Sequence, residues 1–403
     1  MKKIALINDT IDKQDIDELI EWLKTFPRLT KGELTVQLES EWAKYIGTKY
    51  SVFVNSGSSA NLLLLYALSL LSKNSAYAKF YDGNAKVVVP AISWATDLSP
   101  VIQLGFKPIL VDCNMDDLTL DLDQLERTLE SDTHIVAVIS VSVLGFSPNM
   151  GKLLNITKSY HVDLIEDNCE SMGTKYHGKH LGNFGIASTY STYFGHHIST
   201  IEGGFVNTND EDLYHMLLML RSHGWDRDLP EEKRNLLRKH WNVNNFDALL
   251  TFYHPGFNLR STDLNAKLGL LQLKKLNKNV EIRNKNFNTY QSLIWKENVP
   301  NLPGWKPKPL NDTFVSNFAY PVIHPMKYAI TYDLIDAGVE TRPLICGSMG
   351  TQPMYIQKYG NKLLNNANKA DQFGFYVPNH PEMNDEDVEY ICNILNRYKG
   401  VSV

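Results

Sequence analysis

The chain is poor in cysteine. Only four of its 403 residues are cysteines, and they lie far apart, with no Cys-x-x-Cys or Cys-x-Cys pair: Cys113, Cys169, Cys346 and Cys392. A disulfide framework or a cysteine-based metal site is therefore not expected, and a reducing cytoplasm suits this composition. The histidines show no spacing typical of metal ligands either, so we predict no metal site.

The chain also lacks a long apolar run and a strong charge of one sign. Its most apolar stretch, residues 62–71, is too short to span a bilayer, and the first nine residues contain no signal-peptide core. The formal net charge is -5, with no long run of lysine or arginine. Binding to nucleic acid or to a membrane is therefore not indicated.

What is present is an alternation of predicted strands and helices. Short apolar runs at 50–54, 86–90, 107–111, 135–143 and 163–166 are separated by helical patterns. This alternation predicts an α/β fold with one mostly parallel sheet flanked by helices, and the ligand of such a sheet lies beyond the carboxyl ends of its strands. Five candidate site residues fall at those ends: Ser58, Trp94, Asp167, Glu170 and His196.

The pattern changes towards the carboxyl terminus. A charged, less regular insertion is expected at 229–245, and a long helix is expected at 263–276. From about residue 284 short mixed elements lead to a final helix at 385–398. We predict a large domain over residues 1–275, which includes the N-terminal helices, and a smaller C-terminal α+β domain over residues 276–403.

The segment after the first predicted strand has the composition of a phosphate-binding turn. Gly57 lets the backbone approach a ligand closely, and Ser58 and Ser59 supply hydroxyl groups. The helix that follows offers unpaired N–H groups and a favourable dipole at its N-terminus. An ordinary serine cap before a buried helix is the alternative interpretation.

Two adjacent histidines interrupt a strand-like run in residues 188–205, which read S-T-Y-S-T-Y-F-G-H-H-I-S-T-I-E-G-G-F. Imidazole groups on a sharp turn out of a strand occupy a position typical of chemistry in α/β enzymes. Because neighbouring side chains point in different directions, only one of the two histidines is expected to face a ligand. The spacing to Glu202 favours His196 over His197.

Together these segments resemble the sugar aminotransferases of the DegT/DnrJ/EryC1/StrS family. The resemblance runs in order over nearly the whole chain, through residues 55–60, 93–94, 166–171, 191–204 and 256–260. It implies a fold-type I enzyme that depends on pyridoxal 5'-phosphate (PLP). In the large domain, the mostly parallel mixed sheet would carry the cofactor site.

The resemblance also implies how the cofactor would be held. Gly57, Ser58 and Ser191 would bind its phosphate, and Ser59 belongs to the same cofactor-binding group. Trp94 would stack on the pyridine ring, since a flat aromatic face suits a flat cofactor. A plain core tryptophan is the alternative for Trp94.

Three further positions match the family. Asp167 would pair with the protonated pyridine nitrogen, and Glu170 would lie near the reactive edge of the cofactor. Asn258 would reach across a homodimer interface to the phosphate in the partner's site. Considered alone, Asp167 is also compatible with a strand-end turn and Asn258 with a turn after Gly256.

The departure from the family pattern lies at His196. Ordinary members carry a lysine six residues before the Glu-Gly-Gly sequence, where it holds the cofactor covalently. Imidazole cannot form that stable link, so the resemblance implies a non-covalently bound cofactor, used as pyridoxamine 5'-phosphate (PMP). Histidine remains a good proton-transfer group near neutral pH, and His196 is the predicted catalytic residue.

This replacement resembles the family's sugar 3-dehydratases. It implies removal of the C3 hydroxyl from a nucleotide-linked 4-keto-6-deoxy sugar, with L-glutamate restoring PMP. GDP-4-keto-6-deoxymannose is the favoured substrate, and a GDP-6-deoxyheptose stays open because one extra carbon changes few contacts. An iron–sulfur branch that acts on CDP-sugars is disfavoured because the Cys-x-Cys motif is missing.

Other interpretations remain open at this level. His223, Arg227 and Arg342 are candidate contacts to nucleotide or sugar, or are simply solvated charges. The chain could be a nucleotide-sugar 4-aminotransferase whose cofactor lysine lies elsewhere, at Lys175 or Lys179. It could also be a non-catalytic relative that binds PMP or sugar.

Overall fold

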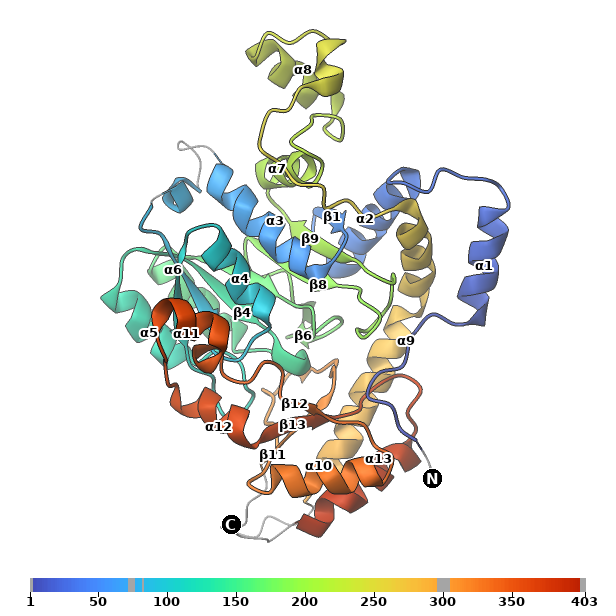
Figure 1. The fold of residues 1–403 in the computed structure, drawn as a ribbon, viewed down its shortest axis with the longest axis vertical. Helices are drawn as coiled ribbons and strands as arrows, with labels where there is room; N and C mark the ends of the chain where they lie inside the picture. The colour runs from blue at the N-terminus through green and yellow to red at the C-terminus, as the bar shows by residue number, and fades with distance from the viewer. Residues whose placement is uncertain (1–2, 72–76, 82, 296–304, 399–403) are drawn as a thin grey trace.

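The computed structural model describes residues 3–71, 77–81, 83–295 and 305–398. A seven-stranded mixed sheet forms its centre (Figure 1). Every neighbouring pair of strands is parallel except the two pairs that contain β9, which runs antiparallel to β1 and β8. The strands, in their order across the sheet, are β1 (Tyr50–Val54), β9 (Gly204–Thr208), β8 (Ala187–Ser191), β5 (Asp163–Asp167), β4 (Ile135–Val141), β2 (Lys86–Pro90) and β3 (Lys107–Val111). The predicted α/β fold with a mostly parallel sheet is confirmed.

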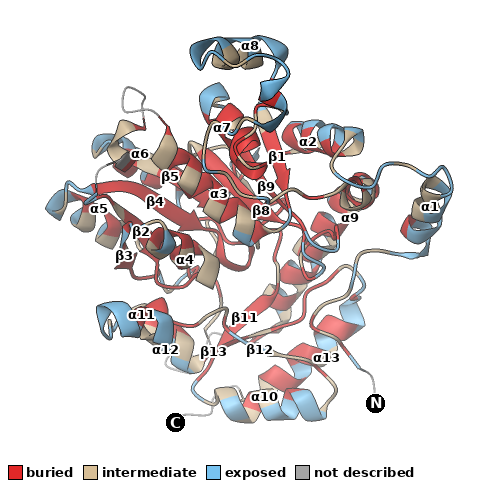
Figure 2. Ribbon diagram, turned by 45° about the horizontal axis from the view of Figure 1, so that its top comes forward, coloured by how far each residue is buried: buried red, intermediate tan, exposed pale blue. Residues whose placement is uncertain are grey.

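Helices cover both faces of this sheet because its strands alternate apolar side chains between the two sides. Val87 and Val89 of β2 belong to the core under α3, α4 and α7, whereas Val88 packs in the core under α5 and α6. Figure 2 shows the strands buried between these layers. The flanking helices are α2 (Glu33–Ile46), α3 (Gly57–Leu70), α4 (Ala95–Gln103), α5 (Leu122–Ser131), α6 (Met150–Ser159) and α7 (Glu211–Arg221).

A 31-residue helix, α9 (Asp263–Leu293), runs from the large sheet to the C-terminal elements. It continues well beyond the predicted end at residue 276. Val280, Phe287 and Tyr290 keep an apolar stripe buried along its second half, and no glycine or proline interrupts that half. The predicted division at residue 275 stays a prediction, and it falls inside this continuous helix.

The insertion at 229–245 contains a helix, so the prediction of irregular structure there is wrong for α8 (Glu231–His240). Two acidic residues stand in its first turn and three basic residues in its last turn, an order that suits the helix dipole. None of its residues is buried, and it projects from the body of the molecule (Figure 1). The charges at its two ends favour a helix here, although the segment has no apolar face to bury.

The C-terminal part builds a small antiparallel sheet with helices around it (Figure 1). Another small antiparallel sheet joins a loop of the large part to a later segment, through β10 (Thr313–Phe314), β6 (Lys175–Tyr176) and β7 (Lys179–His180). The C-terminal elements are β11 (Tyr320–Ile323), α10 (Lys327–Asp336), β12 (Arg342–Pro343), α11 (Pro353–Tyr359), α12 (Asn365–Phe373), β13 (Gly374–Val377) and α13 (Asp385–Leu395).

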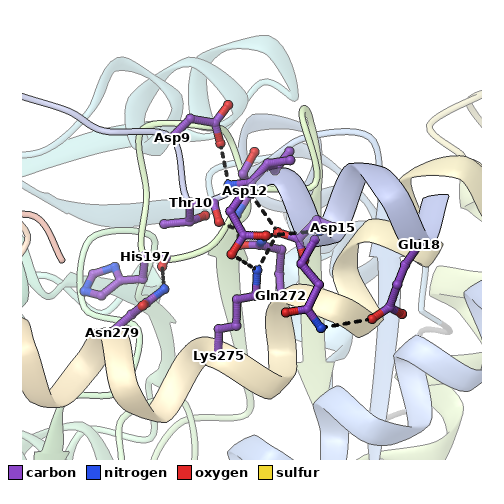
Figure 3. Close-up of polar contacts among 12 residues, drawn as sticks. Asp9, Thr10, Asp12, Asp15, Glu18, His197, Gln272, Lys275 and Asn279 are labelled. Carbon is purple, nitrogen blue, oxygen red and sulfur yellow. Dashed lines mark hydrogen bonds and ion pairs between the residues drawn. The ribbon is translucent and has the colours of Figure 1, made fainter. Parts of the chain in front are cut away.

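The N-terminal helix α1 (Lys13–Leu23) is tied to α9 by polar contacts (Figure 3). Lys275 on α9 forms ion pairs with Asp12 at 2.5 Å and with Asp15 at 2.8 Å. Gln272 on α9 links the segment before α1 to the turn that carries the two histidines, since it donates to the carbonyl of Thr10 at 2.9 Å and accepts the N–H of Ser199 at 3.5 Å. No helix within the described ranges has the length and apolar character that crossing a bilayer requires.

Candidate active site

A cavity of about 400 Å³ opens at the carboxyl ends of the central strands. Its walls contain seven of the residues predicted from sequence to bind cofactor or catalyse: Gly57, Ser58, Trp94, Asp167, Glu170, Ser191 and His196. These residues are far apart in the chain. They meet because the strands that precede them end at one edge of the same sheet.

The N-terminus of α3 forms one wall of the cavity. Ser56 caps this helix with its side-chain oxygen, which accepts the N–H of Ser59 at 3.0 Å. The first intrahelical bond is made by Ala60, so the N–H groups of Gly57 and Ser58 precede it. This end of the helix therefore has the donors and the dipole that an anion requires.

Space at this wall exists only because residue 57 is glycine. A Cβ atom there would lie 2.8 Å from the Cβ of Ser191 and 3.0 Å from the Sγ of Cys169. Ser191 is the last residue of β8, so the helix N-terminus packs directly against the end of that strand. The arrangement fits a phosphate group held by backbone N–H groups and two serine hydroxyls.

Trp94 stands at the N-cap of α4 and lines the cavity. Its side chain is 55% exposed, which is unusual for a tryptophan that also touches the interior. The plain core tryptophan considered above is therefore excluded by its exposure. A flat aromatic face is available at this position to a planar ligand.

Asp167, at the end of β5, is a buried carboxylate held by two donors. Its Oδ1 accepts the N–H of Cys169 at 2.9 Å, and its Oδ2 accepts the side-chain amide of Asn61 at 2.7 Å. The hydroxyl of Thr189 in turn fixes Asn61 at 2.6 Å. Within the described ranges no lysine or arginine forms an ion pair with Asp167, so a cationic group in the cavity would be its natural partner.

The structure separates the two histidines. His196 lines the cavity, and its Nδ1 has no hydrogen-bond partner among the described residues. His197 is buried away from the cavity, with its Nε2 3.2 Å from the carbonyl of Ser316. The prediction that only His196 faces the site agrees with this geometry.

Helix α9 holds the turn that carries both histidines. Asn279 donates to the carbonyl of His197 at 3.2 Å, as Figure 3 shows. Arg283, one turn further along, contacts the carbonyl of His196 at 3.4 Å and that of Phe318 at 2.8 Å. The ring of Phe318 lies 5.3 Å from the His196 ring and forms part of the cavity wall.

Burial shifts the pKa values of two groups that line the cavity, His196 and Glu170. It lowers the pKa of His196 to about 4, with a smaller push from the charge of Arg283, while Asp167 opposes the shift. It raises the pKa of Glu170 to about 7, although the N–H of Leu144 donates to that carboxylate at 2.8 Å. Near neutral pH the cavity therefore offers a neutral imidazole and a carboxyl group close to its titration point.

Five other predicted residues lie outside the cavity. Ser59 belongs to the cap of α3, and Arg342 is exposed on β12. The remaining three, His223, Arg227 and Asn258, come from one region of the structure. The N–H of His223 donates at 2.6 Å to the carbonyl of Phe257, the residue before Asn258. The guanidinium of Arg227 stacks 3.7 Å from the ring of Trp225. Next to them, Asn258 pairs with Ser222.

Several residues in or behind the cavity wall were not expected from the sequence. Asn61 does not line the cavity but donates to Asp167, and it stands one helical turn after Gly57 and Ser58, so helical spacing could have revealed it. Asp97 follows Trp94 by three residues in the same way. Phe318, Ile345 and Tyr376 reach the cavity from the C-terminal part, and no local pattern identifies them.

No lysine of the described chain lines the cavity. The ammonium of Lys179 donates to the carbonyl of Asn183 at 2.9 Å and lies over the ring of Phe184. Lys175 stands on the short strand β6, paired with β7 and β10. Neither of the two lysines considered for a covalent cofactor link is in place for one. The described residues also contain no cluster of three or more potential metal ligands.

The order of the strands, the small C-terminal sheet and the position of the cavity place the chain in the class of fold-type I enzymes with the aminotransferase architecture. The family is equally clear. The model of the DegT/DnrJ/EryC1/StrS aminotransferase family matches residues 9–396, and the chain belongs to this family.

Similar proteins cover nearly the whole chain. GDP-4-keto-6-deoxy-D-mannose 3-dehydratase from Yersinia pseudotuberculosis is 34% identical over 98% of this chain and 99% of its own. The structure of the Escherichia coli GDP-4-keto-6-deoxy-D-mannose-3-dehydratase with bound hydrated PLP matches with a TM-score of 0.86 at 29% identity, over 98% of this chain and all of that one. A GDP-4-keto-6-deoxymannose-3-dehydratase with a trapped PLP-glutamate geminal diamine matches with the same TM-score and coverage at 28% identity.

Proposed function

We propose that this chain is a PLP-dependent nucleotide-sugar 3-dehydratase that binds its cofactor non-covalently. The observation that carries the proposal is a cavity with a phosphate cradle, an exposed tryptophan and a buried carboxylate, in which His196 stands and no lysine of the described chain does. The names of the relatives support GDP-4-keto-6-deoxymannose as the substrate and glutamate as the amino donor.

The cavity residues that were predicted from the sequence each have a role in this proposal. Gly57, Ser58 and Ser191 hold the phosphate, and Trp94 covers one face of the pyridine ring. Asp167 faces the ring nitrogen and keeps it protonated. When bound, the pyridoxamine form supplies a primary amine and an electron-accepting ring.

His196 moves the protons. With the cofactor and sugar bound, its neutral imidazole would accept one proton at the C4' carbon and would donate one to the C3 hydroxyl oxygen that leaves the sugar. Glu170 lines the same cavity, and its carboxyl group, whose pKa burial raises to about 7, would hold or release a proton there. Overall, the sugar loses its C3 hydroxyl and gains a hydrogen, and glutamate becomes 2-oxoglutarate with release of ammonia.

The product of the reaction tests the proposal. The protein would be incubated with PLP, glutamate and GDP-4-keto-6-deoxymannose or a GDP-4-keto-6-deoxyheptose, and the sugar products identified by mass spectrometry. We expect loss of the C3 oxygen, with ammonia and 2-oxoglutarate formed in equal amounts. A 4-amino product that retains the 3-hydroxyl would instead identify an aminotransferase, the activity for which the family is named. Sugar binding without either change would identify a non-catalytic relative.

Restoring a lysine at position 196 provides an independent check. His196→Lys places a primary amine in the cavity, so borohydride is expected to attach the cofactor to residue 196 in the variant and to no residue in the wild type. Peptide mass spectrometry reads this out, and dehydration is expected to fall. Reductive attachment of PLP to any lysine of the wild type would contradict the proposal of non-covalent binding.

We also propose that the enzyme is a homodimer in which Asn258 contacts the phosphate in the partner's site. Within one chain Asn258 lies outside the cavity, in the same region as His223 and Arg227. These two residues are proposed to contact the substrate, so they would approach the partner's site together with Asn258. The neighbouring insertion and the residues directly after it expose large apolar side chains that a partner would cover: Leu236, Trp241, Phe246, Leu250 and Phe252. Arg342 is proposed to contact the sugar nucleotide from its own chain.

Subunit complementation tests the shared site. His196→Asn and Asn258→Ala are each expected to be weakly active alone, and mixed dimers are expected to regain activity because one of their two sites combines both wild-type residues. Light scattering gives the mass of the assembly. A monomeric active enzyme, or no recovery in mixed dimers, would contradict a role for Asn258 in the partner's site. A cytoplasmic location is also proposed, because the chain has only four cysteines and they are far apart in the sequence.

A further inference from the structure

Asp97 is a buried carboxyl group to which no role has been assigned so far. It lies in the first turn of α4, is 1% exposed and contributes to the cavity wall. Its Oδ2 accepts the N–H of Trp94 at 3.0 Å, and its Oδ1 is 3.4 Å from the side-chain amide nitrogen of Asn61. The same amide nitrogen donates to Asp167 at 2.7 Å, so two carboxyl groups share one amide.

Two carboxyl groups this close do not both ionise without a cation. Among the described residues neither forms an ion pair with lysine or arginine. Asp167 has the better donors, at 2.7 and 2.9 Å, whereas one of the two donors to Asp97 is distant. The geometry therefore leaves the negative charge on Asp167 and the proton on Asp97.

The surroundings of Asp97 keep that proton in place. Burial raises its pKa well above the usual aspartate value, and Asp167 raises it further by its charge and by a hydrogen bond between the two side chains. Glu170 adds repulsion of the same sign. The thiols of Cys169 and Cys346 also face Asp97, and burial raises the pKa of each, so both stay neutral and add no charge next to it.

We propose that Asp97 is a positioning residue that acts as a neutral carboxylic acid, donating a hydrogen bond to the Asp167 carboxylate while accepting the backbone N–H of Trp94. The proposal rests on the proposed function, in which Trp94 covers the cofactor ring and Asp167 faces its nitrogen. Asp97 lies on α4 and Asp167 on β5. This bond therefore fixes Trp94, which would stack on the cofactor ring, relative to Asp167, which would pair with the ring nitrogen. Asn61 on α3 braces both.

Replacing Asp97 by asparagine, which has the same shape, tests whether the residue acts as a neutral hydrogen-bond donor or as a negative charge. In Asp97→Asn the amide nitrogen replaces the carboxylic O–H and the amide oxygen still accepts the Trp94 N–H, so PLP affinity is expected to stay within about threefold of wild type. In Asp97→Ala both bonds are lost, and the dissociation constant is expected to rise by about tenfold or more, because hydrogen bonds to charged groups are the strong ones. The circular dichroism of the bound cofactor, per molecule bound, is expected to weaken in the alanine variant only, because its ring is no longer held in one orientation.

Asp117→Ala is the matched control. Asp117 is also buried, and burial raises its pKa to about 6, but it bonds Thr119 and does not line the cavity. This variant is expected to lose stability and to keep the affinity and the dichroism per bound cofactor. Should Asp97→Ala not fold, Asp97→Ser removes the reach to Asp167 and leaves a small hydroxyl near the cap of α4.

The outcomes separate the two proposals. If wild type binds PLP and the asparagine variant is as impaired as the alanine variant, Asp97 acts as a charge and the positioning proposal is overturned. It is also overturned if the alanine variant binds and orients PLP like wild type, and in both cases the proposed function stands. Failure of wild type to bind PLP would overturn both.

Discussion

Replacing His196 by asparagine is expected to lower kcat for dehydration by a factor of about 10² to 10⁴, the usual contribution of a positioned acid–base group. His196 lines the cavity and its Nδ1 is free of protein partners among the described residues. Because its pKa is lowered to about 4, the imidazole is in the neutral, proton-accepting form throughout the neutral range. Asparagine fills similar space and cannot accept and return a proton.

The measurement is single-turnover dehydration by enzyme loaded with PMP, together with the PLP affinity of each variant. Cofactor affinity is expected to change little in His196→Asn, because the phosphate cradle and Asp167 are intact. His197→Asn is the matched control: it alters a buried histidine that bonds Ser316 and points away from the cavity. A rate in His196→Asn within threefold of wild type, or a larger loss in His197→Asn, would contradict the assignment.

Asp167→Asn is expected to weaken PLP binding by about 10²- to 10³-fold, the range that corresponds to breaking a buried ion pair. An amide cannot hold the pyridine nitrogen in its protonated form. It would also place its own N–H₂ group against one of the two donors that now face the carboxylate, the amide of Asn61 or the N–H of Cys169. Loss of a buried charge-assisted hydrogen bond and gain of an unsatisfied donor both act against the bound cofactor.

Absorbance titration with PLP measures this loss, and thermal unfolding reports the fold. Glu166→Gln is the control, because Glu166 precedes Asp167 in β5 and its buried carboxylate binds the N–H groups of Gly182, Phe184 and Gly185 on the other side of the strand. That variant is expected to lose stability while it binds PLP normally once folded. Equal effects of the two substitutions on PLP affinity would contradict the role of Asp167.

Much of the fold follows from local patterns. The turn after β1 was predicted as a phosphate-binding turn or an ordinary serine cap, because a glycine and serines stand there between a strand and a helix, and a helix does begin there, at Gly57. The meeting of Ser58, Trp94, Asp167 and His196 was predicted because the carboxyl ends of neighbouring strands share one edge of a sheet. The alternation of side-chain directions predicted that only one of the two histidines faces a ligand, and the spacing to Glu202 favoured His196.

Other features depend on contacts between distant segments. The length of α9 is set by the apolar surface that the C-terminal elements bury on its second half, which a window of residues near its start does not contain. Phe318 and Tyr376 line the cavity although they follow His196 by more than a hundred residues in the sequence.

The sequence alone determined the type of site, because a histidine at the position of the family's lysine removes the amine, and an amine is a property of the residue and not of its surroundings. The tertiary structure alone decided how that histidine and its neighbours are charged. Burial keeps His196 neutral and brings Asp97 against Asp167, so that one of two identical carboxyl groups is left with the proton. Protonation depends on solvent, dipoles and charges gathered from the whole fold, and these are set by packing.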